Sequence, residues 1–162
     1  MNYELFVTAV KGKDKITRFF NYVLCITVML MGLYFLVDFN KSGKISADYF
    51  FLLLVAMGLY GFYRIPQDYK ITSIASNKTV SDKAEIVKKY LEGKKLFEET
   101  IESNYFQIRY RNKYLTLIDM FIYIDNNYFY INVRQKASGG YLDFGIGKRA
   151  TRKIITHIKD AL

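Results

Sequence analysis

The sequence predicts an α+β membrane protein: an N-terminal two-helix transmembrane hairpin, then a cytoplasmic helix, an antiparallel β-meander and a C-terminal helix. Nearly all of the strongly apolar sequence lies before Pro66, and most of the charge lies after it. From about residue 97 the apolar residues alternate with a period of two, and helical spacing occurs on both sides of that stretch. We therefore divide the chain into an N-terminal cytoplasmic segment (1–18), a transmembrane hairpin (19–65) and a basic cytoplasmic domain (66–162).

The first apolar run, residues 19–37, carries no charge over 19 residues. At 1.5 Å per residue it would reach roughly 28 Å, close to the thickness of the hydrocarbon core. We place the second helix at 47–65 and an external link at 38–46. The second apolar run is shorter, so we expect it to span with local thinning of the bilayer and with Arg64 extended toward the headgroups. Pro66 is expected to end it.

Two buried helices of a soluble protein are the alternative to a membrane hairpin. A domain of this size could not cover two such apolar helices on all sides, so we favour spans. A cleaved signal peptide would have a shorter apolar core, and here a second apolar run follows.

Basic residues flank the two runs and set the expected orientation. The link contains only Lys41 and Lys44, so counting positive charges places both termini in the cytoplasm. The flanking basic residues are Lys11, Lys13, Lys15 and Arg18 before the first run and Arg64 after the second.

Four residues of the hairpin are candidates for a membrane or oligomer interface. Asn21 is the strongly polar side chain nearest the core of the first run; it would lie in the headgroup layer or hydrogen-bond between helices. Gly32, Gly58 and Gly61 would permit close approach of helices, within one chain or between copies.

Two segments leave alternatives open. Residues 1–10 mix aromatic, aliphatic and polar side chains and suit either a short interfacial helix or a strand added to the later sheet. Residues 67–79 suit either a linker or a first strand.

The basic domain begins with a helix and ends with one. We expect Asp82 to open the first helix with Glu85 three residues on, and Gly93 to end it. The last helix is expected at 148–162, after Gly147 has ended the sheet. Between them the alternation predicts four or so strands, at about 106–110, 115–124, 129–133 and 142–146.

Composition limits the chemistry. The net charge is +9, of which residues 66–162 contribute +6, and this charge suits anionic lipid headgroups or nucleic acid. One cysteine and one histidine exclude an internal disulfide and argue against a metal site, so we expect no metal and no cofactor. Phosphate-binding glycine motifs and catalytic triads are not found in the sequence.

Arg152 and His157, the single histidine, form an R-x4-H pattern. This pattern meets the loose ribonuclease motif of the HEPN superfamily, in which Arg would stabilise a phosphorane and His would transfer protons. On one helix, five residues place these side chains about 140° apart, so they would meet only across a symmetric partner. HEPN domains are all-helical, whereas strands are predicted here. A surface Arg and a packed His are the simpler interpretation, and no catalytic residue is expected.

The two-helix anchor, the Tyr- and Lys-rich cytoplasmic domain and the terminal Arg152–His157 motif resemble the small membrane accessory proteins of type VI-B CRISPR systems. The resemblance implies a homo-oligomeric pore in the bacterial inner membrane. With the two spans and the charge count, we expect a multi-pass protein there with both termini cytoplasmic. Such a pore depolarises the membrane in antiviral defence when an RNA-guided RNA-cutting effector complex has been activated by target RNA. The implied partners are the lipid bilayer, further copies of the chain, and that effector or its RNA.

Two other functions remain open. The cytoplasmic domain would be a membrane-tethered sensor, PH-like or a small barrel, that binds a lipid or a nucleotide. Alternatively, Arg152 and His157 would make the chain a membrane-bound HEPN-like ribonuclease.

Overall fold

The computed structural model describes residues 1–12, 15–40, 48–112, 116–135 and 146–162. The chain forms two compact units, one from residues 14–67 and the other from residues 1–13 together with 68–162. The second unit is therefore discontinuous in sequence, because the first unit is inserted between its two pieces.

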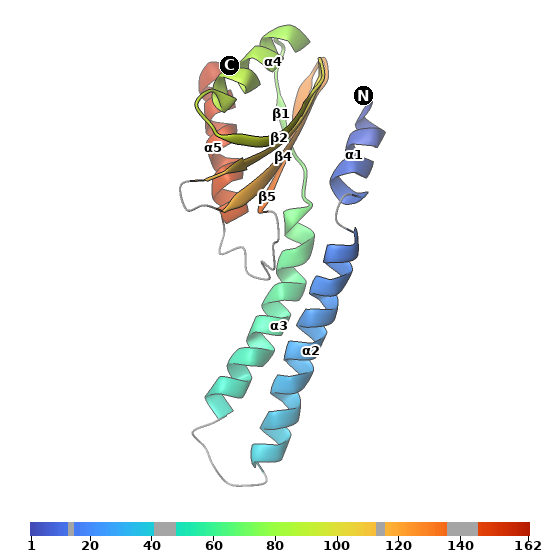
Figure 1. Cartoon of the computed structure of the whole chain (residues 1–162), viewed down its shortest axis with the longest axis vertical. Coiled ribbons are helices and arrows are strands. Elements are labelled where there is room, and N and C mark those ends of the chain that lie inside the picture. The colour runs from blue at the N-terminus through green and yellow to red at the C-terminus, as the bar shows by residue number, and fades with distance from the viewer. Residues whose placement is uncertain (13–14, 41–47, 113–115, 136–145) are drawn as a thin grey trace. The chain divides into compact units, whose positions relative to one another are not determined.

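The inserted unit is a pair of helices, α2 (Lys15–Asn40) and α3 (Asp48–Asp68), which run antiparallel (Figure 1). Both are long and apolar enough to cross a membrane, over Lys15–Asp38 and Tyr49–Asp68. The predicted helices at 19–37 and 47–65 lie within these ranges, except that residue 47 and most of the predicted link are outside the described residues. By the same length test, the core helix of a soluble protein or a signal sequence would also qualify.

The prediction that Pro66 ends the second helix is wrong, since α3 includes Pro66 and continues to Asp68. Proline removes one backbone donor and crowds the carbonyl four residues before it, but its fixed φ is close to a helical value. In the last turn of α3 the loss of this donor costs little free energy, because few helical hydrogen bonds follow Pro66.

The other unit is an α+β domain built on a five-stranded antiparallel sheet of order β1-β5-β4-β3-β2. Its elements are α1 (Tyr3–Gly12), β1 (Thr72–Ala75), α4 (Val80–Leu91), β2 (Leu96–Ile101), β3 (Tyr105–Arg111), β4 (Leu117–Ile124), β5 (Tyr128–Gln135) and α5 (Ile146–Ala161).

The predicted meander is confirmed for β2 to β5, and 67–79 contains a strand, β1, that pairs with β5. The meander begins at Leu96, close to residue 97 where the period of two was expected to start, although β2 was not predicted as a separate strand. The strand predicted at 142–146 falls mostly outside the described residues, and Ile146 itself begins α5. Gly147, expected to end the sheet, lies in the first turn of that helix.

Helices cover both faces of the sheet (Figure 1). On one face, α4 and α5 bury the alternating residues of the strands, among them Ile108, Met120 and Ile131. On the other face, Phe6 and Val10 of α1 pack against Tyr105, Phe121 and Tyr123. Of the two alternatives for residues 1–10, the helix is therefore observed, packed on the sheet, and the added strand is wrong.

The first domain helix starts earlier than predicted. Thr79, not Asp82, is the N-cap of α4: its hydroxyl oxygen accepts a hydrogen bond from the Asp82 amide at 3.2 Å. The same hydroxyl donates to the Asp82 carboxylate at 2.8 Å, so Asp82 lies at the third helical position and contacts the cap through both its amide and its side chain. At the other end Gly93 has a φ of 76°, the left-handed conformation that follows many helices.

Candidate functional site

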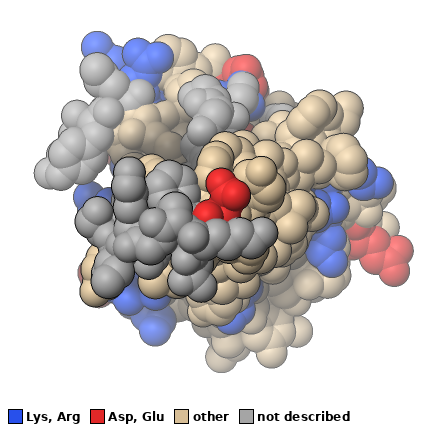
Figure 2. Space-filling model, turned by 90° about the horizontal axis from the view of Figure 1, so that it is seen from below, with Lys and Arg blue, Asp and Glu red and all other residues tan. Residues whose placement is uncertain are grey.

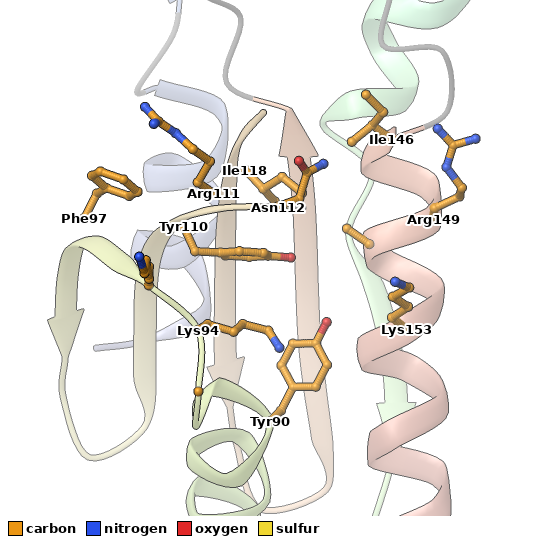
Figure 3. A pocket seen from close by; sticks show the side chains of 13 residues that line it. Tyr90, Lys94, Phe97, Tyr110, Arg111, Asn112, Ile118, Ile146, Arg149 and Lys153 are labelled. Atoms are coloured by element: carbon orange, nitrogen blue, oxygen red, sulfur yellow. The ribbon is translucent and has the colours of Figure 1, made fainter. Parts of the chain in front are cut away.

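A cavity of about 750 Å³ lies where the end of α4, the start of β2, the end of β3 and the first turns of α5 meet (Figure 3). Its volume falls within the range of small-molecule sites. Buried apolar groups form its floor: Tyr110 from β3, Ile118 from β4 and Ala150 from α5. The alternation of β3 and β4 directs these side chains to the face that α5 covers.

Cations surround this floor. The described residues that line the cavity include five Lys or Arg and no Asp or Glu. These cations come from three parts of the fold: Lys94 and Lys95 after α4, Arg111 at the end of β3, and Arg149 and Lys153 on α5. We call this group the cationic cavity. On the face that Figure 2 shows, Lys and Arg atoms, drawn in blue, appear at several separate places.

Lys94 is the most enclosed of the five cations. Its ammonium nitrogen lies 3.9 Å from the ring centroid of Tyr90 and 5.9 Å from that of Tyr110, so two aromatic faces contact it (Figure 3). Burial lowers the pKa of Lys94, and the nearby positive charge of Lys153 lowers it further. Two ammonium groups thus face one cavity, and an anion between them would favour the charged form of both.

Tyr90 and Tyr110 link α4 to the sheet beside Lys94. A side-chain hydrogen bond joins them, and burial raises the pKa of both phenols above the ordinary value. Both phenols are therefore protonated at physiological pH. A neutral phenol can donate a hydrogen bond, so this pair adds a donor to the cationic wall.

A second aromatic–cation pair lies on the strand side of the cavity. The guanidinium carbon of Arg111 is 4.9 Å from the ring centroid of Phe97, which is 52% exposed. An exposed aromatic ring with a guanidinium over it is a surface on which a planar group can stack. Figure 3 shows this pair opposite Arg149 and Lys153.

The structure does not bring Arg152 and His157 together as a catalytic pair. Arg152 is exposed on α5. His157 lies against α4, with its Nε2 3.3 Å from the Ile86 carbonyl oxygen and its ring 5.3 Å from that of Tyr90. His157 also lines a smaller hollow of about 380 Å³ that Arg152 does not line. The described residues contain no group of three metal-binding side chains.

The predicted interface glycines lie between α2 and α3. A Cβ at Gly32 would come within 2.8 Å of Val55 Cγ2, and a Cβ at Gly58 within 2.8 Å of Met29 Cβ. Gly61 is buried as well, and Asn21 is half-buried one helical turn before the buried Cys25. Gly32 and Gly58 therefore allow the two helices of one hairpin to approach closely.

The predicted flanking basic residues lie near the ends of the helices. Lys11 and Lys15 are exposed, whereas Arg18 and Arg64 are half-buried. Lys13 is outside the described residues.

Sequence reasoning missed the cationic cavity. Its five cations lie on three segments that are separated in the chain, and only the fold unites these segments. A local signal does exist in the interleaving of basic and aromatic residues at 94–97 and 109–111 and in the basic pairs 148–149 and 152–153. Comparison with models of known families, with curated proteins and with solved structures gives no match.

Proposed function

We propose that the chain is a hairpin-anchored membrane protein in which α2 and α3 span the bilayer and the α+β domain lies on the cytoplasmic side. The two candidate spans have 24 and 20 residues. At 1.5 Å per residue they reach about 36 Å and about 30 Å, enough for a hydrocarbon core. Only 11% and 22% of their most apolar windows are buried, so most of this apolar surface needs another cover, and lipid provides it.

The discontinuous domain supports an even number of crossings. Phe6, which precedes the hairpin, is fully buried against strands that follow it. Both pieces of the domain must therefore lie on one side of the membrane. If α2 crosses, α3 must cross back. Independently of this packing, the count of positive charges favours the cytoplasm for both ends.

The domain is proposed to bind a small anionic ligand in the cationic cavity, which makes the protein a membrane-tethered sensor. The observation that carries this proposal is a buried apolar floor with five cations around it, and the described residues of the lining include no carboxylate. The site does not depend on a barrel, since the described strands form an open sheet with β1 and β2 at its edges.

The test is ligand binding by the full chain in nanodiscs of neutral lipid. A fragment that starts at residue 67 is unsuitable, because it lacks α1 and would expose Phe121 and Tyr123. Anionic small molecules should raise the melting temperature of the domain, and neutral analogues should not. Lys94→Ala combined with Lys153→Ala should remove the effect, whereas the exposed Lys159→Ala should retain it. Equal stabilisation of both variants would contradict the proposal.

The anchor has its own test. The chain should stay with the membrane fraction after extraction at high pH and should be released by detergent. Release at high pH alone would contradict the two spans.

An antiviral pore is the second proposal. Its support is the exposed apolar surface of α2 and α3, which further copies of the hairpin could cover. Within the described parts of α2 and α3, the exposed positions from Phe19 to Val37 and from Tyr49 to Tyr63 are apolar or aromatic except for Thr27. Any water-filled lumen would therefore need tyrosines and Thr27 to line it.

The pore has two measurable consequences. A dye that reports membrane potential should show depolarisation in cells that contain the chain and its activated RNA-guided partner. The detergent-solubilised protein should have the mass of a multimer. A monomer with unchanged polarisation would contradict the pore, because two helices cannot enclose a water-filled path.

A further inference from the structure

The wall that Lys94 and Lys153 share is suited to a group with more than one negative charge. Lys94 lies between two phenol rings, and Lys153 is close enough to oppose its protonation. A single carboxylate can offset one of these charges. A phosphate group carries nearly two negative charges and three acceptor oxygens, so it can accept from both ammonium groups and from a phenol.

The size of the cavity indicates that this ligand has an organic part. An inorganic anion would leave most of the approximately 750 Å³ unfilled and would not contact the apolar floor. The side chains of Ile118, Ala150 and Tyr110 offer that floor to an apolar or planar body. Burial of such a body would add favourable free energy to the ionic contacts.

The opposite side of the cavity is suited to a flat ring system. Phe97 is exposed, and Arg111 already covers it at 4.9 Å. Aromatic and guanidinium surfaces are the groups on which bases stack in proteins that bind single-stranded nucleic acid. The cavity thus presents phosphate-binding groups on α5 and after α4, and stacking groups on β2 and β3 (Figure 3).

We propose that the cationic cavity is a nucleotide site, in which Lys94 and Lys153 hold a phosphate and Phe97 with Arg111 contacts the base. This inference rests on the proposed function of the cavity as an anion site and adds the class of ligand. The aromatic pair then sets the preference for a base, and the ammonium pair supplies the affinity for phosphate.

The experiment measures binding to the full chain in neutral nanodiscs by calorimetry. The probes are ATP, GTP, CTP and UTP, with pyrophosphate, citrate and adenosine as matched fragments and analogues. At least one nucleotide should bind at least about tenfold more tightly than pyrophosphate, and adenosine should bind weakly or not at all. Lys94→Ala and Lys153→Ala should each weaken the binding of that nucleotide about tenfold. Lys159→Ala, on the same helix as Lys153, should leave its binding unchanged.

The stacking part has a separate variant. Phe97→Leu should weaken the binding of the nucleotide but leave the binding of pyrophosphate unchanged, because Phe97 is proposed to contact only the base. Phe97 is half-exposed, so its replacement should not disturb the fold. Binding of pyrophosphate as tight as that of the nucleotides, with no effect of Phe97→Leu, would leave the anion site standing and overturn the nucleotide assignment.

Two further outcomes are informative. Vesicles that contain anionic phospholipid would overturn the nucleotide assignment if they bind more tightly than every nucleotide and do so through Lys94. Absence of binding by all of the anions, with a folded protein, would contradict both the nucleotide site and the anion site beneath it.

Discussion

Asn132 and Arg134 lie two residues apart on β5 and hold the two chain segments that lead into the hairpin. The Arg134 side chain donates from Nη1 to the carbonyl oxygen of Val10 at 2.7 Å, near the end of α1. Asn132 donates from Nδ2 to the carbonyl oxygens of Asp68 at 2.9 Å and Lys70 at 3.1 Å, where the chain leaves α3. Both side chains are at least 97% buried. One strand therefore holds both chain segments of the α+β domain at the points where they adjoin the hairpin in sequence.

Replacement of Arg134 by Met should detach the end of α1. The guanidinium donates to a carbonyl at the C-terminal end of the helix and lies 4.8 Å and 4.9 Å from the rings of Tyr69 and Phe121. Loss of a charged hydrogen bond at this buried position should lower the free energy of unfolding by about 2 kcal/mol. Urea denaturation of the full chain in detergent measures this loss of free energy. Arg152→Met, at an exposed position, is the control and should lower the free energy of unfolding by less than about 0.5 kcal/mol. Equal stability of the two variants would contradict this role.

Asp119→Asn should destabilise the same face of the sheet. Asp119 and Arg109 are buried opposite one another on β4 and β3, and the carboxylate accepts from Arg109 Nε at 2.7 Å. Removing one partner leaves a buried guanidinium with less compensation, at a cost of about 3 kcal/mol. Glu98 also forms an ion pair with Arg109, and this contact should limit the loss.

The matched control for that pair is a double replacement. Arg109→Met with Asp119→Leu should recover most of the stability, since apolar residues can replace a buried ion pair with little loss. A double variant as unstable as Asp119→Asn would show that the ion pair has a role that packing cannot supply.

Gly58→Val should force α2 and α3 apart. A Cβ at Gly58 would lie 2.9 Å from the Cys25 carbonyl oxygen, and backbone cannot move aside as a flexible side chain can. The cost should be about 2 kcal/mol, as for other overpacked sites. Spin labels at the exposed Leu30 and Leu53 should report an increased separation. Gly12→Ala is the control, because nothing lies within 4 Å of its Cβ position.

Anion binding should weaken as the pH rises toward 10.5. The pKa of Lys94 is lowered by burial and by Lys153, so this ammonium loses its charge at a lower pH than an exposed lysine. Affinity for an anion should therefore be full below that lowered pKa and fall above it. Lys94→Arg keeps its charge throughout and should retain binding at pH 10. Calorimetry of both proteins from pH 7 to 10 measures it, and parallel profiles would contradict the role of Lys94.

The ligand-free domain should respond to pH in the opposite sense. Because the folded pKa of Lys94 is below its unfolded value, the unfolded chain holds more protons between the two values, and stability rises with pH there. Above about pH 10 the raised pKa values of Tyr90 and Tyr110 reverse the trend, since the unfolded phenols ionise first. A stability maximum is therefore expected at about pH 10, where the two opposing trends meet, and thermal melts measure it.

Local patterns in the sequence predicted the elements whose causes are local. The period of two predicted β3, β4 and β5 to within two residues, because each of those strands has one face in the core. The long uncharged runs predicted α2 and α3, because a helix that is apolar over its whole length is visible in the local sequence. The start of α4 was predicted three residues late, since both Thr79 and Asp82 can cap a helix and only the hydrogen-bond geometry distinguishes them.

Long-range contacts account for what the sequence did not predict. The packing of α1 depends on Phe6 meeting Tyr105 and Phe121, and nothing near residue 6 specifies that meeting. The cationic cavity depends likewise on Lys94 and Lys153 being placed across one space by α4, the sheet and α5. A pairing of residues so far apart leaves no periodic trace in either segment.

The discontinuity of the α+β domain also dictates an order of events during synthesis. Phe6 leaves the ribosome before the hairpin does, and Phe121, its partner, follows after 115 more residues have been added. At ordinary translation speeds this delay is on the order of ten seconds. During that interval the hairpin is made while α1 keeps its apolar side uncovered. A helix made before the hairpin thus reaches its packed position only after the sheet has been made.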